Sequence, residues 1–206
     1  SLETAVRLVR FRAEAMQSAV PVGVGGMAAV IGLADDDVEA AVAEARETGR
    51  VEAVNFNAPG QVVIAGEKAA VARAIECAKA LGCRRAIELP VSAPFHSSLM
   101  QPAADKLAAR LVETEIQVPA IPVIANIDVE MHETHDAIRE ARARQAAGAV
   151  QWVRTIERMK ATGITDIVEC GPGKVLTGLL RRTAPEINGH NIFDAASLAA
   201  VLEKLN

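Results

Sequence analysis

The spacing of apolar residues changes near residue 20. Along residues 3–18 they recur at helical intervals, with Leu8, Ala15 and Met16 on one side, which predicts an amphipathic helix. The glycine-rich segment VPVGVGG at 20–26 interrupts this spacing. Short apolar runs then alternate with longer helical patterns, so the sequence predicts an α/β region after the first helix.

Residues 27–91 alternate in the order β-α-β-β-α-β. The apolar pattern predicts strands at 27–33, 51–57, 61–66 and 83–91, and helices at 34–49 and 67–82. The sequence APG at 58–60 joins the middle strands as a hairpin. This order is the ferredoxin-like arrangement, a two-layer unit that closes its own sheet. We therefore expect residues 23–91 to form a ferredoxin-like subdomain.

The remaining residues predict a different architecture. Helices are predicted at 97–114, 135–148, 150–163, 171–183 and 195–206, and strands at 121–127 and 164–171. Helices that alternate with strands indicate a parallel α/β sheet. Two parallel strands do not form a stable sheet alone, so we expect residues 1–22 and 92–206 to be parts of a larger α/β core.

Composition narrows the class of protein. Half of the 206 residues are apolar but only 2% are aromatic, and the net charge of -4 gives no nucleic-acid footprint. No apolar run is long enough for a membrane span, and no signal peptide opens the chain. Three cysteines without metal-ligand spacing predict free thiols in a cytoplasmic setting. Since Ser1 stands where a helix is already under way, we expect the chain to be part of a longer protein.

Two glycine motifs and one histidine pair do not support cofactor or metal sites. GVGGMA at 23–28 precedes a strand, whereas a dinucleotide fingerprint follows one. GPGKVLTG lacks the phosphate-loop spacing and has Val175 in place of a hydroxyl. His132 and His135 have no third ligand in view, which favours a solvated loop. We therefore expect no metal and no cofactor.

His96 and Arg12 are the candidate functional residues that the pattern itself selects. His96 lies between a strand and a helix, where the helix N-terminus disfavours a charged ring and favours a general base. The alternative is a hydrogen-bonded loop histidine. Arg12 lies on the apolar side of the first helix and needs a carboxylate, from the protein as a structural ion pair or from a ligand. Asn55 and Asn57 are by themselves ordinary turn formers.

Six segments carry a family resemblance. RLVRFRAEAMQ, GGMAAVIGL, VNFNAPGQVVIAG, LPVSAPFHSSLM, PVIANID and ECGPGKVLTGLLRR occur in this order. Together they resemble the later two thirds of the malonyl-CoA:acyl carrier protein transacylases of fatty acid biosynthesis, over essentially the whole chain. The resemblance implies a hydrolase-like parallel α/β core with an inserted ferredoxin-like subdomain. It also implies a cytoplasmic enzyme that is monomeric at full length, with malonyl-CoA and acyl carrier protein as partners and neither nucleic acid nor membrane.

The resemblance also implies residue roles. His96 corresponds to the base that activates a serine, and Gln145 to the residue whose main-chain carbonyl orients the imidazole. Arg12 corresponds to the arginine that pairs with the free malonyl carboxylate. Met16 and Asn55 then belong to the substrate pocket, and Phe95 resembles a phenylalanine that favours malonyl over methylmalonyl. A basic region used for carrier-protein docking corresponds to Lys174, Arg181 and Arg182, although these charges equally suit a solvated helix end.

The nucleophile is the main departure from the family pattern. No G-x-S-x-G elbow occurs, and the family's glutamine loop is also missing. The resemblance places the serine upstream of Ser1, so we expect this chain alone to be inactive. The alternatives are a truncated, non-catalytic homologue that binds acyl carrier protein, a polyketide synthase domain, and a hydrolase that uses Ser97 or Ser98.

Overall fold

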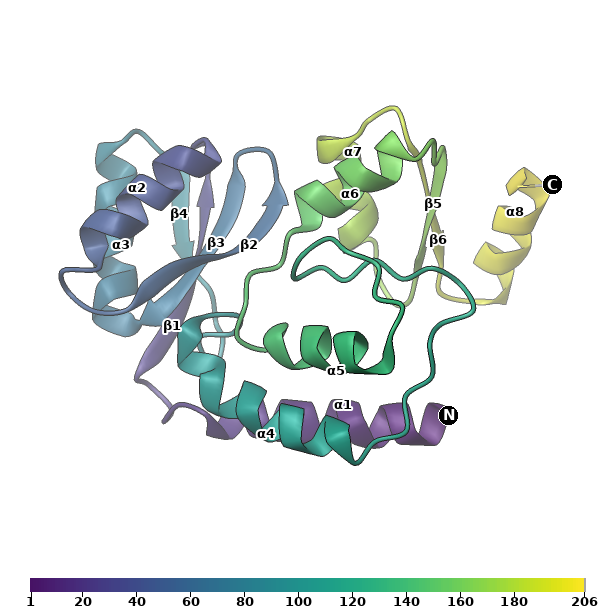
Figure 1. Ribbon diagram of the computed structural model, residues 1–206. Helices are drawn as coiled ribbons and strands as arrows, with labels where there is room; N and C mark the ends of the chain where they lie inside the picture. Colours follow the sequence, from purple (N-terminus) through teal and green to yellow (C-terminus); the bar gives the residue numbers. More distant parts are fainter. Residues whose placement is uncertain (206) are drawn as a thin grey trace. The chain divides into compact units, whose positions relative to one another are not determined.

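The computed structural model describes residues 1–205 as two compact units, which divide between Gln151 and Trp152 (Figure 1). The first unit contains α1 (Leu2–Ser18), β1 (Gly25–Ile31), α2 (Asp35–Ala45), β2 (Val51–Ala58), β3 (Gln61–Glu67), α3 (Lys68–Ala80), β4 (Arg85–Glu88), the 3-10 helix η1 (Ser98–Met100), α4 (Gln101–Val112) and α5 (His135–Arg144). The second unit contains α6 (Trp152–Ala161), β5 (Asp166–Cys170), α7 (Val175–Thr183), β6 (Asn188–Ile192) and α8 (Ala195–Leu205).

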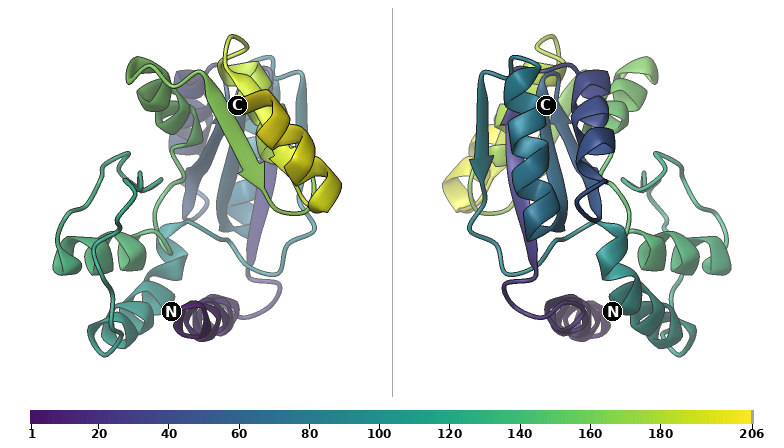
Figure 2. Two further views of the ribbon diagram at one scale, coloured as in Figure 1. Left: turned by 90° about the vertical axis from the view of Figure 1, so that its right-hand side faces the viewer. Right: turned by 90° about the vertical axis from the view of Figure 1, so that its left-hand side faces the viewer.

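The first unit contains an antiparallel sheet of four strands in the order β2-β3-β1-β4. Helices α2 and α3 cover one face of this sheet (Figure 2). The element order from β1 to β4 is the β-α-β-β-α-β order expected for residues 27–91. The α/β fold class is therefore confirmed, whereas the subdomain boundaries at 23 and 91 stay a prediction because both lie inside the first unit.

The two faces of this sheet have different neighbours. Side chains alternate along each strand, so Ala28 and Val30 of β1 join the core under α2 and α3. Met27 of β1 and Val63 of β3 belong to a separate apolar cluster on the opposite face, with Phe95 packed against it. This opposite face is where the first unit forms its candidate site.

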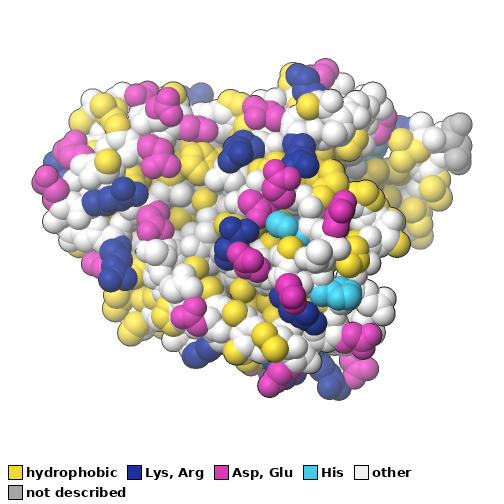
Figure 3. Space-filling view, in the orientation of Figure 1, with side chains coloured by type: hydrophobic (Ala, Val, Ile, Leu, Met, Phe, Trp, Pro, Cys, Tyr) yellow, Lys and Arg dark blue, Asp and Glu magenta, His cyan; other side chains and the backbone are white. Residues whose placement is uncertain are grey.

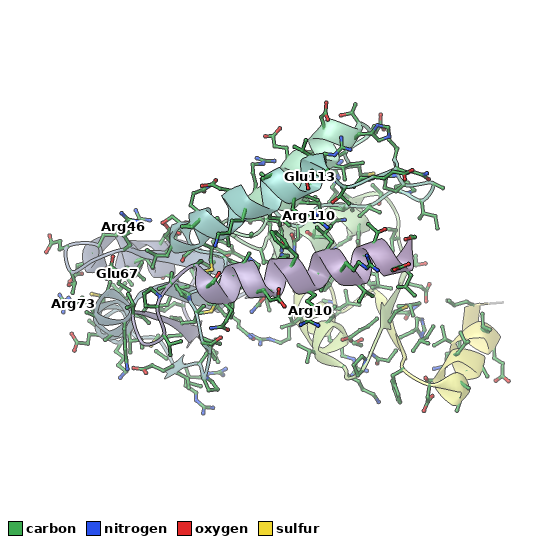
Figure 4. All side chains as sticks on the ribbon, turned by 90° about the horizontal axis from the view of Figure 1, so that it is seen from below. Arg10, Arg46, Glu67, Arg73, Arg110 and Glu113 are labelled. Atoms are coloured by element: carbon green, nitrogen blue, oxygen red, sulfur yellow. The ribbon has the colours of Figure 1, made fainter. Side chains whose placement is uncertain are left out.

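Helices α1, α4 and α5 pack around a second core in the first unit. Ser1 caps α1 by accepting the backbone N–H of Thr4 at 3.2 Å, and a proline lies in the first turn of α4. Met16 and Leu107 are among the buried side chains between these helices. Figure 4 shows α1 and α4 side by side. This packing fixes the direction of α1 and of the side chains that it presents.

The second unit is built on a parallel pair of strands. β5 and β6 pair from Asp166 with Asn188 to Cys170 with Ile192. Ile156 of α6 and Leu180 of α7 are fully buried in the core of this unit. A parallel pair agrees with the parallel α/β core expected for this region.

One of the two strands predicted for the later region is wrong. Residues 121–127 form no strand: the side chain of Ile121 is 79% exposed, and Ile124 makes only an isolated bridge to Met131. Pro122 removes one backbone donor from this segment, and Pro119 removes another just before it. No strand among residues 1–205 lies alongside it, so its apolar pattern alone does not produce a strand.

Strand β6 was not predicted because its sequence, NGHNI, is poor in the residues that favour strands. The structure accommodates its polar side chains with carboxylates of β5. His190 Nε2 lies 2.9 Å from Asp166 Oδ1, and Asn191 donates to Glu169 at 2.9 Å. These bonds satisfy the polar side chains of His190 and Asn191. Hydrophobic periodicity alone reads such polar side chains as a sign that no buried strand is present.

Three further features complete the description. The three cysteines are free thiols, as expected. Basic and acidic side chains are intermixed within each unit on the face drawn in Figure 3. Among residues 1–205, no helix combines the length and apolar character that crossing a membrane requires.

The paired glycines Gly26 and Gly66 of β1 and β3 provide a test of the sheet. A Cβ at Gly66 would lie 2.1 Å from the Arg50 carbonyl oxygen, so Gly66→Ala should destabilise the protein by about 2 kcal/mol or more. Its cross-strand partner Gly26 has no atom nearer than 3.9 Å to such a Cβ, so Gly26→Ala should change stability by about 1 kcal/mol or less. Urea unfolding of both variants measures this difference, and equal midpoints would contradict the register.

Candidate active site

An open cavity of about 540 Å³ lies in the first unit, between α1, the second face of the sheet and the segment before η1. Most of the predicted site residues line it: Arg12, Met16, Asn55, Phe95 and His96. They come from three separate parts of the chain, so the fold brings together residues that the sequence keeps more than 80 positions apart. Gln145 is the remaining predicted residue of the site, and it contacts two of the five directly.

Helix α1 supplies Arg12 and Met16, which lie one turn apart on the same side of the helix. Met16 is only 3% exposed and is part of the core between the helices. The burial of Met16 anchors this turn of α1. The half-buried Arg12 lines this cavity and also a neighbouring one of about 360 Å³, which Arg142 and Gln145 line as well.

Strand β2 supplies Asn55 at an irregular point of the ladder. The register shifts between Ala53 and Asn55, and Asn55 is then opposite Val63, another residue of the cavity. Next to it, Val150 donates to the Val54 carbonyl at 2.8 Å and accepts from the Phe56 N–H at 3.0 Å. These bonds tie the segment that follows α5 to the edge of β2.

His96 has a backbone conformation that is unusual for its residue type. Its φ is 65°, in the left-handed region that residues with a Cβ seldom occupy. The buried Ser97 donates its hydroxyl to the Pro94 carbonyl at 2.7 Å. Pro94 in turn packs so closely on β1 that a Cβ at Gly25 would lie 2.3 Å from its Cδ. Packing on both sides of His96 therefore holds the strained turn.

The imidazole of His96 is oriented by the end of α5. Its Nδ1 lies 3.1 Å from the main-chain oxygen of Gln145, which can only accept, so Nδ1 carries the proton. In the neutral ring Nε2 is then the unprotonated nitrogen. Ring orientation by a carbonyl leaves Nε2 available as a proton acceptor, which a general base requires.

Burial lowers the pKa of His96, and the charge of Arg12 lowers it further. The carbonyls of Gln145 and Gly148 act in the opposite direction and raise it. The neutral ring expected from the sequence agrees with this direction, but the expected cause does not. The helix N-terminus after His96 is occupied by Glu52, whose carboxylate accepts the Ser98 N–H at 2.7 Å.

Arg12 has no carboxylate partner within ion-pair distance among residues 1–205. Two other arginines of α1 do: Arg7 pairs with Glu3 at 2.6 Å, and Arg10, labelled in Figure 4, pairs with Glu14 at 2.8 Å. The guanidinium of Arg12 instead donates to Gln145 Oε1, a neutral oxygen, at 2.8 Å. A structural ion pair is therefore not what holds Arg12.

Partial burial lowers the pKa of Arg12, and the nearby charge of Arg142 lowers it further. The ordinary pKa of arginine is so high that the guanidinium stays protonated at neutral pH. A partly desolvated cation that lacks a counter-charge favours an anion from solution. The arrangement can therefore hold a ligand carboxylate on one side of the cavity and accept a proton at His96.

Three further residues of the site were not predicted. Gln17 and Asn57 also line the cavity, and Gln17 accepts a hydrogen bond from Ser92 at 2.7 Å. Arg142 lies on α5, three residues before Gln145, and its charge lowers the pKa of Arg12. A spacing of three residues places Arg142 and Gln145 on one side of a helix, and this was the only signal in the sequence.

Other candidate residues lie outside the cavity. Ser97 is 1% exposed and already donates its hydroxyl, which disfavours it as a nucleophile. His132 is partly buried, with Nε2 3.3 Å from Asp128, whereas His135 begins α5 and is exposed. His135 is therefore exposed as expected but lies in a helix, whereas His132 lies outside the helix but is partly buried.

The predicted docking residues belong to the second unit and are all exposed. Lys174 directly precedes α7, with its ammonium 5.7 Å from the ring centroid of Phe193. Arg181 and Arg182 lie in the last turn of the same helix, about 10 Å away along its axis. The three cations therefore do not form one cluster, and their docking role stays a prediction.

Comparison with known proteins shows which family the chain matches. A model of the acyl transferase domain matches residues 1–203. The malonyl CoA-acyl carrier protein transacylase of Escherichia coli K12 is 49% identical over 199 residues, which are 97% of this chain and 64% of that protein.

Two solved structures show the same similarity. The acyl-carrier-protein S-malonyltransferase of Burkholderia pseudomallei 1710b is 56% identical, with a TM-score of 0.95 over 97% of this chain and 65% of that one. A malonyl-transacylase in complex with its type II PKS acyl-carrier protein is 46% identical, with a TM-score of 0.95 and the same coverage.

The chain belongs to the acyl transferase domain family. Within that family, the proteins just described, to which it is similar at 46 to 56% identity, are malonyl transacylases of acyl carrier protein. The chain spans somewhat less than two thirds of their length.

The protonation of His96 tests the electrostatics of this site. We expect the ring to titrate below a free histidine, with Arg12→Ala raising its pKa and Arg12→Lys, which keeps the charge, raising it less. Because the folded pKa is lowered, the stability linked to this group is present above the unfolded pKa and is lost as the pH falls through the folded one. An NMR pH titration of the ring measures the folded pKa of His96 in the three proteins. An identical pKa in all three would exclude an effect of Arg12.

Proposed function

We propose that the whole protein moves a malonyl group from coenzyme A to the phosphopantetheine thiol of acyl carrier protein, through a serine ester. Residues 1–206 supply the general base and the carboxylate-binding cation. The observation that carries this proposal is the pair of hydrogen bonds made by Gln145. Its main-chain oxygen lies 3.1 Å from His96 Nδ1, and its side-chain amide oxygen accepts from the Arg12 guanidinium at 2.8 Å. A proton acceptor and an unpaired cation are thereby held beside one cavity.

His96 is the base in this proposal. As the serine oxygen attacks the thioester, Nε2 of the neutral imidazole takes the serine hydroxyl proton. The imidazolium later gives this proton to the leaving thiol. The imidazolium that forms is stabilised at Nδ1 by the Gln145 carbonyl. Burial and the charge of Arg12, which lower the pKa of His96, keep the ring neutral and ready to accept a proton.

Arg12 selects the substrate. A guanidinium pairs with a carboxylate through two parallel N–H donors, and partial burial strengthens this pairing. Malonyl carries a free carboxylate, whereas acetyl does not. Asn55, Met16 and Phe95 complete the pocket and limit the size of the acyl group.

The nucleophile is proposed to lie outside these residues. The sequence holds no nucleophile elbow, and the relatives are about half as long again as this chain. The other candidate is a homologue that binds acyl carrier protein without catalysis. Support for carrier binding in either case comes from the similar transacylase solved with its acyl-carrier protein and from the exposed cations Lys174, Arg181 and Arg182. We place this activity in the cytoplasm with the rest of fatty acid synthesis.

Substitution of Arg12 tests the substrate class. In the full-length protein, Arg12→Ala should lower kcat/KM for malonyl-CoA about a hundredfold, as expected for the loss of a partly buried charge pair. Loading from acetyl-CoA, measured at a pH where His96 is neutral in both proteins, should change little. Arg10→Ala, on the same helix but paired with Glu14, should leave both rates near wild type. Equal losses for the two acyl groups would contradict a carboxylate-binding role.

Substitution of His96 tests the base. His96→Ala should lower the rate of acyl-enzyme formation by about 10² to 10⁴, the usual contribution of a general base. Intact mass after exposure to malonyl-CoA measures the adduct on the protein. A malonyl adduct that forms on His96→Ala at the wild-type rate would remove His96 from the mechanism, and one on residues 1–206 alone would show that the nucleophile lies within them.

A further inference from the structure

Gln145 makes two contacts that are chemically independent. Its main-chain oxygen lies 3.1 Å from His96 Nδ1, and its side-chain Oε1 accepts from the Arg12 guanidinium at 2.8 Å. The first contact exists for any residue at position 145, because it uses the backbone. The second exists only for a side chain of this length that ends in an acceptor.

The backbone at position 145 is fixed from both sides. Gln145 ends α5 in helical conformation and donates its own N–H to Ala141 at 3.0 Å. A few residues later, Val150 is bonded to β2, and Gln151 donates to the Asn126 carbonyl at 2.8 Å. The Gln145 side chain therefore extends toward Arg12 from a position that is held by both α5 and the sheet.

The group that accepts the hydrogen bond from Arg12 is neutral, so it does not offset the positive charge of the guanidinium. A carboxylate at the same place would hold the guanidinium equally well but would cancel its charge and compete with an anionic ligand. An amide oxygen fixes one N–H of the fork and leaves the full positive charge for the ligand. No other side-chain bond of Arg12 occurs among residues 1–205, so this contact is what restrains the guanidinium.

We propose that the side chain of Gln145 is a positioning group for Arg12, which sets the enzyme's preference for acyl groups that carry a carboxylate. It does so by aiming the guanidinium into the cavity without neutralising it. The same residue thus orients the base through its backbone and the carboxylate-binding cation through its amide. This inference rests on the proposed malonyl transfer.

The test uses two substitutions in the full-length protein. Gln145→Met keeps the length and the backbone carbonyl but removes the acceptor, and should raise KM for malonyl-CoA about tenfold with little change in kcat. Gln145→Glu keeps the acceptor but adds a charge, and should lower kcat/KM for malonyl-CoA more than methionine does. At a pH where His96 is neutral in every variant, both changes should lower loading from acetyl-CoA less than loading from malonyl-CoA, since an acetyl group makes no use of Arg12.

Two controls separate positioning from structural damage. Gln101→Met removes an exposed glutamine on α4 that bonds Asp105, and should leave KM unchanged. The acidic limb of the pH profile of kcat/KM should be the same in Gln145→Met and wild type, because the carbonyl that orients His96 remains.

The outcomes distinguish this inference from the proposed function. If Gln145→Met loses malonyl and acetyl loading equally, or loses neither, the positioning role is wrong. If Gln145→Glu matches wild type for malonyl-CoA, the neutrality of the side chain is irrelevant and the inference also fails. If Arg12→Ala itself shows no malonyl-specific loss, the proposed function fails first.

Discussion

The site depends on one contact, the hydrogen bond from His96 Nδ1 to the main-chain oxygen of Gln145. It joins a strained turn before η1 to the end of α5, and each side of the contact is fixed by separate packing. Pro94 against Gly25 holds the turn, and the bonds of Val150 to β2 hold the segment after α5. The sheet thus serves as a common frame for both sides of the contact.

The electrostatics follow from this arrangement. Arg12 and His96 face one cavity, so the cation helps to keep the ring neutral, and burial reinforces this effect. Because the restraint on Arg12 is an amide rather than a carboxylate, the cavity retains an uncompensated positive charge. Catalytic sites often hold such groups at a cost in stability, since charge and strain there serve binding and chemistry. His96, with its positive φ, and Arg12, without a counter-ion, show both features.

Much of this could be predicted from the sequence. Periodicity located α1 and the β-α-β-β-α-β unit because their apolar faces are regular, and the resemblance selected the residues that meet in the cavity. Periodicity failed where polar bonds decide the structure. It missed β6, whose His190 and Asn191 are satisfied by carboxylates of β5, and it proposed a strand at 121–127, where Pro122 removes a donor. It also could not show that Glu52 occupies the helix N-terminus after His96, or that Arg12 bonds an amide, because both partners are distant in sequence.

A crystal structure of the full-length protein bearing a malonyl ester tests whether Arg12 binds the malonyl carboxylate while His96 faces the ester. We expect the malonyl carboxylate to make two hydrogen bonds with Arg12, Gln145 Oε1 still to accept from the same guanidinium, and Nε2 of His96 to face the ester oxygen. A carboxylate bound away from Arg12, with the guanidinium turned out of the cavity, would contradict the account.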